Sequence, residues 1–202
     1  MPKTKQQCET LKAKRRQDMI VAATNIFAFY NYQDVTTDTI TASLKCSHGL
    51  FYHYYKSKEE IYFDVLDKAI SATKALIDAK EINNLKGSEA LRCILGTILD
   101  TINKNDKYLI SAMFLLLNSR VQIEDIPQTE EILVKSQLAT NKIFQLIEKG
   151  QKDGTILAGN PEEYNTCLSA LIKGLLYNRL MSDSENFVCP SINTVMNLVE
   201  VR

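Results

Sequence analysis

Residues 36–58 read TTDTITASLKCSHGLFYHYYKSK, and this stretch decides the fold because it has the length and pattern of two short helices joined by a turn. Thr36 stands where a helix N-cap is expected, since its hydroxyl can accept from a free backbone N–H in the first turn. Ile40 and Leu44 then fall four residues apart, on one helix face. Residues 45–46 supply the turn.

The second helix of this pair is crowded with aromatic residues and carries both histidines of the chain. Ser47 can cap it, and Phe51, Tyr54 and Tyr55 share a face that should point into a small core. Gly49 exposes backbone where alanine would be more favourable by about 1 kcal/mol, which suggests close approach to another molecule. This pattern is typical of a helix-turn-helix, whose second helix enters the DNA major groove. Spacing alone leaves a compact helical hairpin as the alternative.

Composition places the chain among ordinary globular proteins. Its 202 residues are 45% hydrophobic and 24% charged, and one or two domains are expected at this length. No apolar run approaches the roughly 20 residues that span a bilayer. The basic N-terminus lacks the apolar core of a signal peptide. We therefore expect a cytoplasmic protein.

The residue types that carry out catalysis or bind metals are scattered. The five cysteines are far apart, with no CxxC pair, so neither a disulfide framework nor a zinc site is indicated. His48 and His53 are too few for a metal site. Gly-rich phosphate loops, HExxH, GxSxG and Cys-His-Asp arrangements do not occur in the sequence. We expect no enzymatic activity, no cofactor and no metal. A redox-sensing cysteine remains an open alternative.

Charge is unevenly placed although the whole chain is neutral. Residues 1–58 hold 9 Lys/Arg and 4 Asp/Glu, a net charge of +5, and residues 59–202 hold 15 and 20, a net charge of −5. Proteins that bind nucleic acids need a basic face. The sequence therefore predicts a DNA-binding domain at residues 1–58 joined to a body of different function.

The N-terminal residues lead into the first helix of this domain. We expect a mostly disordered arm over residues 1–16 and a helix from about residue 10 to 30. Arg15 and Arg16 are predicted to contact phosphates; a solvated tail is the alternative. Asn31 is expected to end the helix in a left-handed conformation.

The remaining chain reads as a series of helices, and the predicted fold class is all-α. Only seven glycines and four prolines occur, and alternating apolar runs are scarce. Predicted N-caps are Ser57 with Glu60, Ser88, Asp106 and Asn160, the last followed by proline. A break is expected at Pro127. Helices are expected over residues 57–80, 88–103, 106–117, 128–152, 160–181 and 191–201.

A set of spaced positions runs through residues 17–62: Ile20, Ala23, Phe27, Thr36, Ile40, Ser47, Gly49, Tyr52, Tyr54, Ser57, Lys58 and Glu59. Together they resemble the N-terminal domain of TetR-family transcriptional regulators. The sequence departs from the family at three positions, where Asn31 and Lys45 replace glycines and Leu50 replaces a small polar residue. The resemblance implies a three-helix helix-turn-helix domain, a linking helix at 57–80, and a helical effector-binding and dimerisation domain at 81–202.

The resemblance also implies roles at the DNA. Thr36 and Tyr52 would touch phosphates, and Lys58 would hold the backbone from the next helix. Leu50 could contact a thymine methyl instead of donating a hydrogen bond. For each position a cap, a core contact or a solvated side chain is the alternative. The expected DNA-binding residues are Arg15, Arg16, Thr36, Thr37, Ser47, His48, Gly49, Leu50, Tyr52, His53 and Lys58.

The body should hold an effector pocket and a dimer interface. Residues 108–117 are apolar on all sides, so their helix is either buried or lines a cavity. We expect an apolar or aromatic effector near Cys93, Met113, Phe114, Leu117, Asn118, Lys173 and Tyr177; ordinary core is the alternative. The two last helices are expected to pair in a homodimer. The expected interface residues are Leu168, Leu171, Leu175, Ile192, Val195, Met196 and Val199.

The functional hypothesis is a DNA-binding repressor that a small-molecule effector releases from a near-palindromic operator. One alternative is a helical ligand-binding or scaffold dimer without sequence-specific DNA binding. Another is an activator that has no small-molecule effector. Salt-dependent DNA binding separates the hypothesis from the first alternative, and ligand-induced loss of binding separates it from the second.

Overall fold

The computed structural model describes residues 5–78, 82, 84–118, 129–182 and 186–201, and helices dominate this part of the chain. The predicted all-α class is confirmed: a single isolated bridge between Ile156 and Glu200 is the only β pairing among the described residues. The predicted break at Pro127 lies outside them. The elements are α1 (Lys5–Phe29), η1 (Tyr32–Asp34), α2 (Thr37–Ser43), α3 (His48–Tyr54), α4 (Lys58–Asp78), α5 (Gly87–Lys104), α6 (Lys107–Asn118), α7 (Thr129–Lys152), α8 (Pro161–Met181) and α9 (Ile192–Met196).

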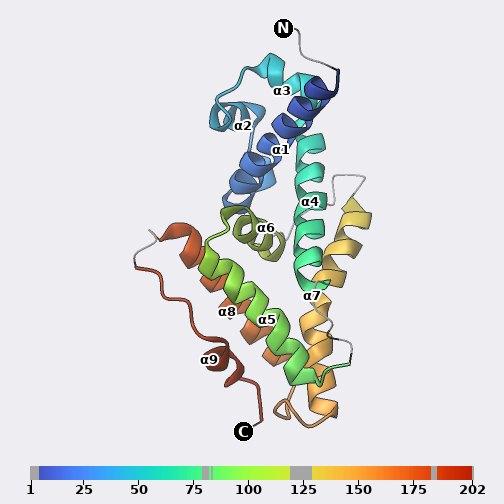
Figure 1. Ribbon diagram of the computed structural model, residues 1–202, viewed down its shortest axis with the longest axis vertical. Coiled ribbons are helices and arrows are strands. Elements are labelled where there is room, and N and C mark those ends of the chain that lie inside the picture. The colour runs from blue at the N-terminus through green and yellow to red at the C-terminus, as the bar shows by residue number, and fades with distance from the viewer. Residues whose placement is uncertain (1–4, 79–81, 83, 119–128, 183–185, 202) are drawn as a thin grey trace.

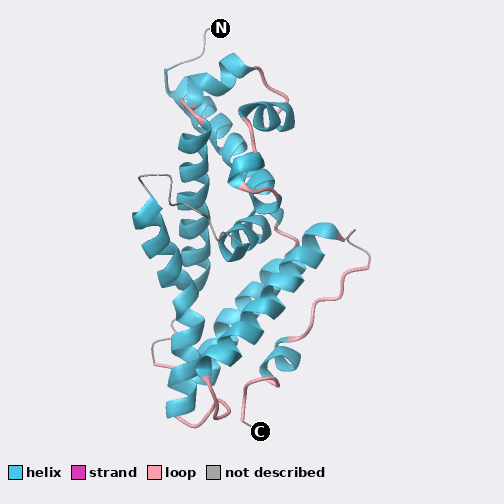
Figure 2. Cartoon of the chain, turned by 180° about the vertical axis from the view of Figure 1, so that it is seen from behind, coloured by secondary structure: helices cyan, strands magenta, loops and turns pink. Residues whose placement is uncertain are grey.

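The helices form a small head on an elongated body (Figure 1). Helices α1, α2 and α3 make the head, and α4 runs from it along the body beside α7. Helix α6 packs against both α1 and α4, directly beneath the head. After α8 the chain returns along the body as a segment that contains α9, seen from behind in Figure 2. We call residues 186–201 the C-terminal strap.

One hydrophobic core runs through head and body. Ile40 and Phe51 are fully buried in the head, and Ile94 and Ile110 are at most 1% exposed in the body. All four belong to the same hydrophobic cluster. Phe114 of α6 lies between the two parts. Its ring centroid is 5.8 Å from that of Phe29 in α1 and 5.9 Å from that of Tyr177 in α8. Because protein interiors are close-packed, a displacement of α6 must also displace the head residues that pack against it.

Most predicted helix starts are confirmed, and one is wrong. The side-chain oxygens of Thr36, Ser57, Asp106 and Asn160 each accept a backbone N–H from two or three residues further on, at 2.9–3.3 Å. Ser88 is not a cap. Helix α5 begins one residue earlier, at Gly87, and Ser88 is buried with its N–H donating to Thr155 Oγ1 at 3.1 Å. The contact from across the fold adds to a local one, since Lys86 N donates to Glu89 Oε2 at 3.2 Å in the first turn.

The N-terminal segment differs from the prediction in two ways. The described part of the expected disordered arm is helical, since α1 already begins at Lys5. Asn31 does not adopt the left-handed conformation: its φ is −60° and its ψ is 148°. Its side-chain amide donates instead to Asp34 Oδ2 at 3.2 Å, across the short helix η1. The chain therefore leaves α1 through an extended residue and a 3₁₀ turn.

The predicted last helix, 191–201, is too long. Helix α9 spans only Ile192–Met196. Beyond it the backbone pairs with the turn after α7: Leu157 N donates to Val199 O at 2.8 Å, and Val201 N donates to Thr155 O at 3.1 Å. These bonds satisfy backbone groups that a longer helix would have used internally.

The expected dimer interface needs correction because most of its side chains are used inside the protomer. Leu168, Val195, Met196 and Val199 are buried to 2% exposure or less. Leu171, Leu175 and Ile192 are half-buried against the same core. Residues that meet a second copy should be exposed on a single chain. The exposed face of α8 is a different one, made of Thr166, Cys167, Ala170, Lys173, Gly174, Tyr177, Asn178 and Met181.

The turn of the helix-turn-helix carries a strained lysine, as its position suggested. Lys45 has a φ of 49°, a left-handed conformation that costs non-glycine residues roughly 1–2 kcal/mol. Glycine would relieve the strain but adds freedom to the unfolded chain. We expect Lys45→Gly to raise the free energy of unfolding by about 0.5–1 kcal/mol in urea titrations. Asn105→Gly is the control: its φ is 56°, but asparagine tolerates this region and should gain less. A less stable Lys45→Gly protein would contradict the prediction.

Candidate nucleic-acid interface

Helix α3 is fixed by its cap and by two aromatic rings. Ser47 Oγ accepts from Leu50 N at 3.2 Å at the start of the helix. Phe51 is fully buried and Tyr55 is 1% exposed, which confirms the face predicted to point inward. Their ring centroids are 6.0 Å apart. Two buried rings on one side of so short a helix determine which side faces away from the protein.

The opposite side of α3 is open. His48, Gly49, Tyr52 and His53 are exposed, Tyr52 by 53%. A Cβ placed on Gly49 would approach nothing closer than Ser47 Oγ, at 4.0 Å, so no packing inside the protomer requires glycine there. His48 Nε2 lies 3.0 Å from Asp38 Oδ1, which joins the exposed surfaces of α2 and α3. This face can be inserted into a groove without disturbing the core.

Three other residues expected at the DNA lie at the edges of this face. Thr36 is exposed and its hydroxyl caps α2, while Thr37 is half-buried at the first position of that helix. Leu50 is half-buried and packs against the head core. Its proposed contact with a thymine methyl therefore depends on the part of the side chain that remains exposed.

Arg16 takes part in a network that ties three helices together. Its Nε donates to Asp64 Oδ2 of α4 at 3.0 Å, and its guanidinium lies 5.1 Å from the centre of the Tyr55 ring. The Tyr55 hydroxyl donates to the same carboxylate oxygen at 2.7 Å. Burial, followed by this hydrogen bond, raises the pKa of Tyr55 above its usual value. The hydrogen bond that Arg16 donates to Asp64 is the main cause that raises the pKa of Arg16.

Lys58 is engaged inside the head in a similar way. Its Nζ donates to the Tyr32 carbonyl oxygen at 2.8 Å and lies 4.1 Å from the centre of the Tyr32 ring. The Tyr32 hydroxyl in turn donates to Glu59 Oε1 at 2.5 Å. That hydrogen bond is the main cause that lowers the pKa of Glu59. Arg16 and Lys58 therefore position α1 and α4, and their expected contacts with DNA remain predictions.

Sequence reasoning missed Asp64 and Tyr32, the partners in these two networks. No local spacing marks them, because Arg16 and Asp64 are 48 residues apart and Lys58 and Tyr32 are 26 apart. Arg15 differs from its neighbour: its guanidinium makes no hydrogen bond or ion pair with any residue that the structure describes. A groove of about 400 Å³ lies between α1 and α3, lined by Glu9, Lys12, Ala13, Arg16, His53 and Tyr54.

The seven residues expected at the effector are spread over α5, α6 and α8 in the part of the chain that the structure describes. Met113 and Phe114 are buried in the core, and Leu117 and Asn118 are half-buried at the end of α6. Lys173 and Tyr177 are exposed on α8, although Tyr177 does contact Phe114. Cys93 lines a separate groove between α5 and the C-terminal strap.

Two other classes of site are absent from the described ranges. No group of three or more His, Cys, Asp or Glu side chains is placed to hold a metal ion there. None of the helices described is both long and apolar enough to cross a bilayer.

Comparisons with known proteins agree with this geometry. Residues 19–65 match the family model for bacterial regulatory proteins of the tetR family. The HTH-type transcriptional regulator YhgD of Bacillus subtilis (strain 168) is 24% identical over 188 residues, 93% of each chain. The transposon Tn10 TetC protein of Escherichia coli is 30% identical over 95 residues, which are 46% of this chain and 47% of TetC. The ketosteroid transcriptional regulator KstR2 of Mycobacterium tuberculosis has a similar fold, with a TM-score of 0.69, 13% identity, and coverage of 93% of this chain and 96% of that chain.

A helix-turn-helix with an exposed recognition face, carried on a helical body, defines a DNA-binding transcriptional regulator. The resemblance to TetR-family regulators is confirmed over residues 19–65, and the chain as a whole has a fold similar to that of such regulators.

Proposed function

We propose that the protein is a repressor that binds a near-palindromic operator as a homodimer and leaves it when a small molecule binds the body. The exposed face of α3 carries this proposal, because no packing inside the protomer requires glycine at position 49, Tyr52 is 53% exposed, and both stand in a domain of net positive charge. Phosphate contacts would supply much of the affinity, and base contacts from α3 would supply specificity.

The proposed dimer uses the exposed face of α8. Cys167, Ala170 and Gly174 are small residues on this face and allow another helix to approach closely, and a Cβ on Gly174 would meet nothing within 4 Å. Tyr177 and Met181 continue the face with 46% and 55% exposure. Two heads related by a twofold axis would reach half-sites about one helical turn apart.

The route from body to head passes through α6. This helix packs on α1 and on α4, and its Phe114 contacts aromatic rings of both the head and α8. An effector that prefers one position of α6 would therefore change the orientation of the heads. Such coupling is typically about 1–3 kcal/mol.

The function is tested by fluorescence anisotropy of the full chain with the DNA upstream of its own gene, against an unrelated duplex. We expect tighter binding to the upstream DNA, two protomers per duplex, and weakening as salt rises. Equal, weak binding to both duplexes and to a randomised pool would favour the scaffold alternative. Specific binding that no small molecule reduces would favour the activator.

The same assay tests Arg15 as a phosphate ligand. Arg15→Ala should weaken binding to all sequences alike and reduce the slope of log K against log salt by about 1. Because Arg15 has no hydrogen bond or ion pair to lose among the described residues, the free energy of unfolding of the Arg15→Ala protein should equal that of the parent. Lys74→Ala is a control, since Lys74 lies on α4 in an exposed pair with Asp78. An unchanged salt slope in Arg15→Ala would exclude the contact.

A further inference from the structure

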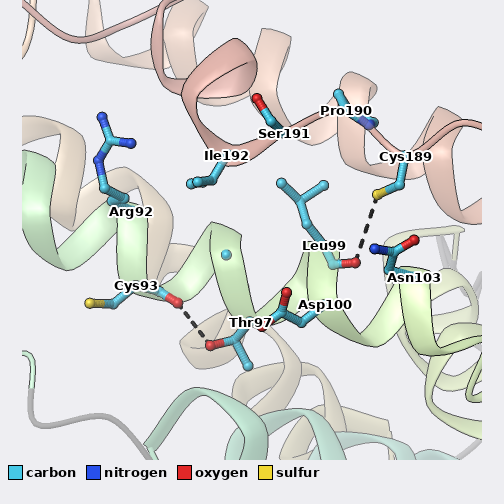
Figure 3. Close-up of a pocket in the computed structure, with 11 residues that line it drawn as sticks. Arg92, Cys93, Thr97, Leu99, Asp100, Asn103, Cys189, Pro190, Ser191 and Ile192 are labelled. Carbon is cyan, nitrogen blue, oxygen red and sulfur yellow. Dashed lines mark hydrogen bonds between the residues drawn. The ribbon is translucent and has the colours of Figure 1, made fainter.

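A groove of about 550 Å³ separates α5 from the C-terminal strap. Figure 3 shows its two walls: Arg92, Cys93, Thr97 and Asp100 come from α5, and the opposite wall is strap residues 189–192. The volume is within the range of small-molecule sites. The groove lies on the side of α5 that faces the strap, and the buried residues Met113 and Phe114 do not line it.

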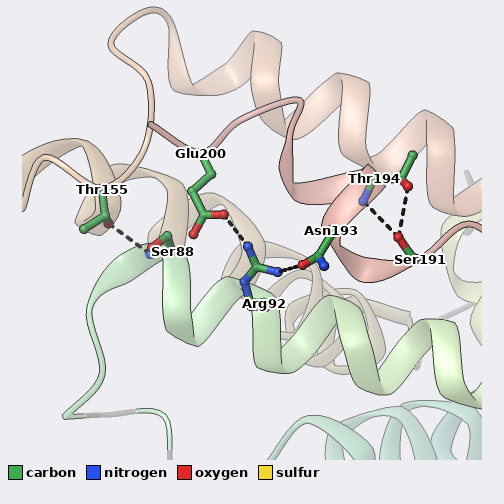
Figure 4. A network of polar contacts seen from close by, with 7 residues as sticks. All are labelled: Ser88, Arg92, Thr155, Ser191, Asn193, Thr194 and Glu200. Atoms are coloured by element: carbon green, nitrogen blue, oxygen red, sulfur yellow. Dashed lines mark hydrogen bonds and ion pairs between the residues drawn. The ribbon is translucent and has the colours of Figure 1, made fainter. Parts of the chain in front are cut away.

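The walls of the groove are held in place at both ends. At one end Arg92 donates to Asn193 Oδ1 at 2.6 Å and pairs with Glu200, as Figure 4 shows. At the other end the thiol of Cys189 donates to the Leu99 carbonyl oxygen at 3.7 Å. The strap is thus fastened over α5, and a ligand would enter a preformed site.

The floor of the groove is bare because of one glycine. Gly96 lies in the middle of α5, where glycine costs about 1 kcal/mol relative to alanine. A Cβ at this position would meet only Ile192 Cγ1, at 4.0 Å, so no close packing requires glycine. The result is an open apolar space between Gly96, Ile192 and Leu99 that a short hydrocarbon could fill.

Charge is unbalanced along the groove. Arg92 is neutralised by Glu200, whereas the exposed carboxylate of Asp100 has no ion pair among the described residues. Thr97 and Asn103 also line the groove; the Thr97 hydroxyl donates to the Cys93 carbonyl oxygen at 2.8 Å, and the Asn103 amide can both donate and accept. Arg179 does not line the groove; its guanidinium lies 5.1 Å from the centre of the Phe187 ring. Asp100 is therefore the charged group of the groove without an ion pair among the described residues, and it suits a ligand that donates hydrogen bonds and carries positive charge.

We propose that this groove is the effector site and that it takes a small primary amine in its ammonium form. The ammonium pairs with Asp100, and a short apolar body lies over Gly96. This inference rests on the proposed function, since it assigns the effector's place and chemistry. The ammonium end is close to α6, because Asn103 stands in the last turn of α5 and α6 begins at Lys107. A ligand there lies at the end of α5 that connects to α6, the helix beneath the head.

Isothermal titration calorimetry of the full chain with n-butylammonium chloride tests the site without DNA. The parent protein should bind butylammonium saturably. It should bind n-butanol and butyrate at least tenfold more weakly than butylammonium. Asp100→Asn should bind butylammonium at least tenfold more weakly than the parent does. Gly96→Leu, which fills the floor with a good helix former, should not bind. Asp18→Asn is the matched control on an exposed residue of α1 and should bind like the parent. Equal binding by the parent and Asp100→Asn, no binding by the parent, or equal binding of the amine and butanol would overturn the proposal.

Anisotropy with upstream DNA tests the regulatory part. Butylammonium should weaken DNA binding by the parent and leave Asp100→Asn unaffected. DNA binding that persists in both proteins, when calorimetry shows Asp100-dependent binding, would overturn the groove's role as the effector site. A parent protein that recognises no operator even without amine would instead overturn the proposed function, and the calorimetric result for the groove would stand.

Discussion

Asp64→Ala is expected to lower the free energy of unfolding by about 3 kcal/mol and to weaken operator binding. The substitution removes the one acceptor shared by Arg16 and Tyr55. Hydrogen bonds to charged groups contribute about 1.5–3 kcal/mol, and the hydroxyl of the nearly buried Tyr55 would lose its partner. The Arg16 side chain is 49% exposed, so its share of the effect is the smaller one. Urea titration measures the loss of stability.

Two variants separate the parts of this effect. Tyr55→Phe keeps the ring and the Arg16–Asp64 pair and should cost only about 1 kcal/mol. Asp64→Asn keeps an acceptor for the hydroxyl but removes the charge, and should fall between the two. DNA binding should weaken in the same order, because Tyr55 follows α3 directly and the network fixes this helix against α1 and α4. An Asp64→Ala protein as stable as the parent would show that the network does not hold the head together.

The helix-turn-helix could be predicted from sequence because its determinants are local. Thr36 and Ser47 cap helices by bonding three residues ahead, and Phe51 and Tyr55 are four residues apart, the spacing that predicts two rings on one side. The exposed side of α3 then follows from the buried side. The networks around Asp64 and Tyr32 could not be predicted, since they join residues that only the folded chain brings together.

The C-terminal part shows the limit of periodicity more clearly. Leu168 and Ile172 are four residues apart, as are Val195 and Val199, and this spacing indicates an apolar face but not what covers it. The structure covers these residues with the protomer's own core and ends α9 at Met196. The groove beneath the strap could not be predicted either, because Gly96 and Cys189 are 93 residues apart in sequence and line one groove only in the folded chain, where Arg92 pairs with Glu200 and Cys189 donates to Leu99.

Gly49→Ala should separate stability from DNA binding. Alanine removes part of the entropic cost of glycine in α3 and meets no atom closer than Ser47 Oγ, 4.0 Å from the added Cβ. The variant should therefore be as stable as the parent or more stable, by up to about 1 kcal/mol. If the backbone of α3 approaches DNA closely at this position, the methyl group will hold the helix away. We expect at least a tenfold loss of operator affinity, about 1.4 kcal/mol.

Gly96→Ala provides the matched control, because it makes the same change in the middle of α5, where a Cβ also meets only one atom at 4.0 Å. It should gain stability in thermal denaturation and bind operator like the parent when no amine is present. The contrast is informative because misfolding would lower stability and affinity together, whereas a steric block at the DNA lowers affinity alone. Undiminished operator binding by Gly49→Ala would mean that DNA does not approach this part of α3 closely, and the recognition face would have to be centred on Tyr52 and His53 instead.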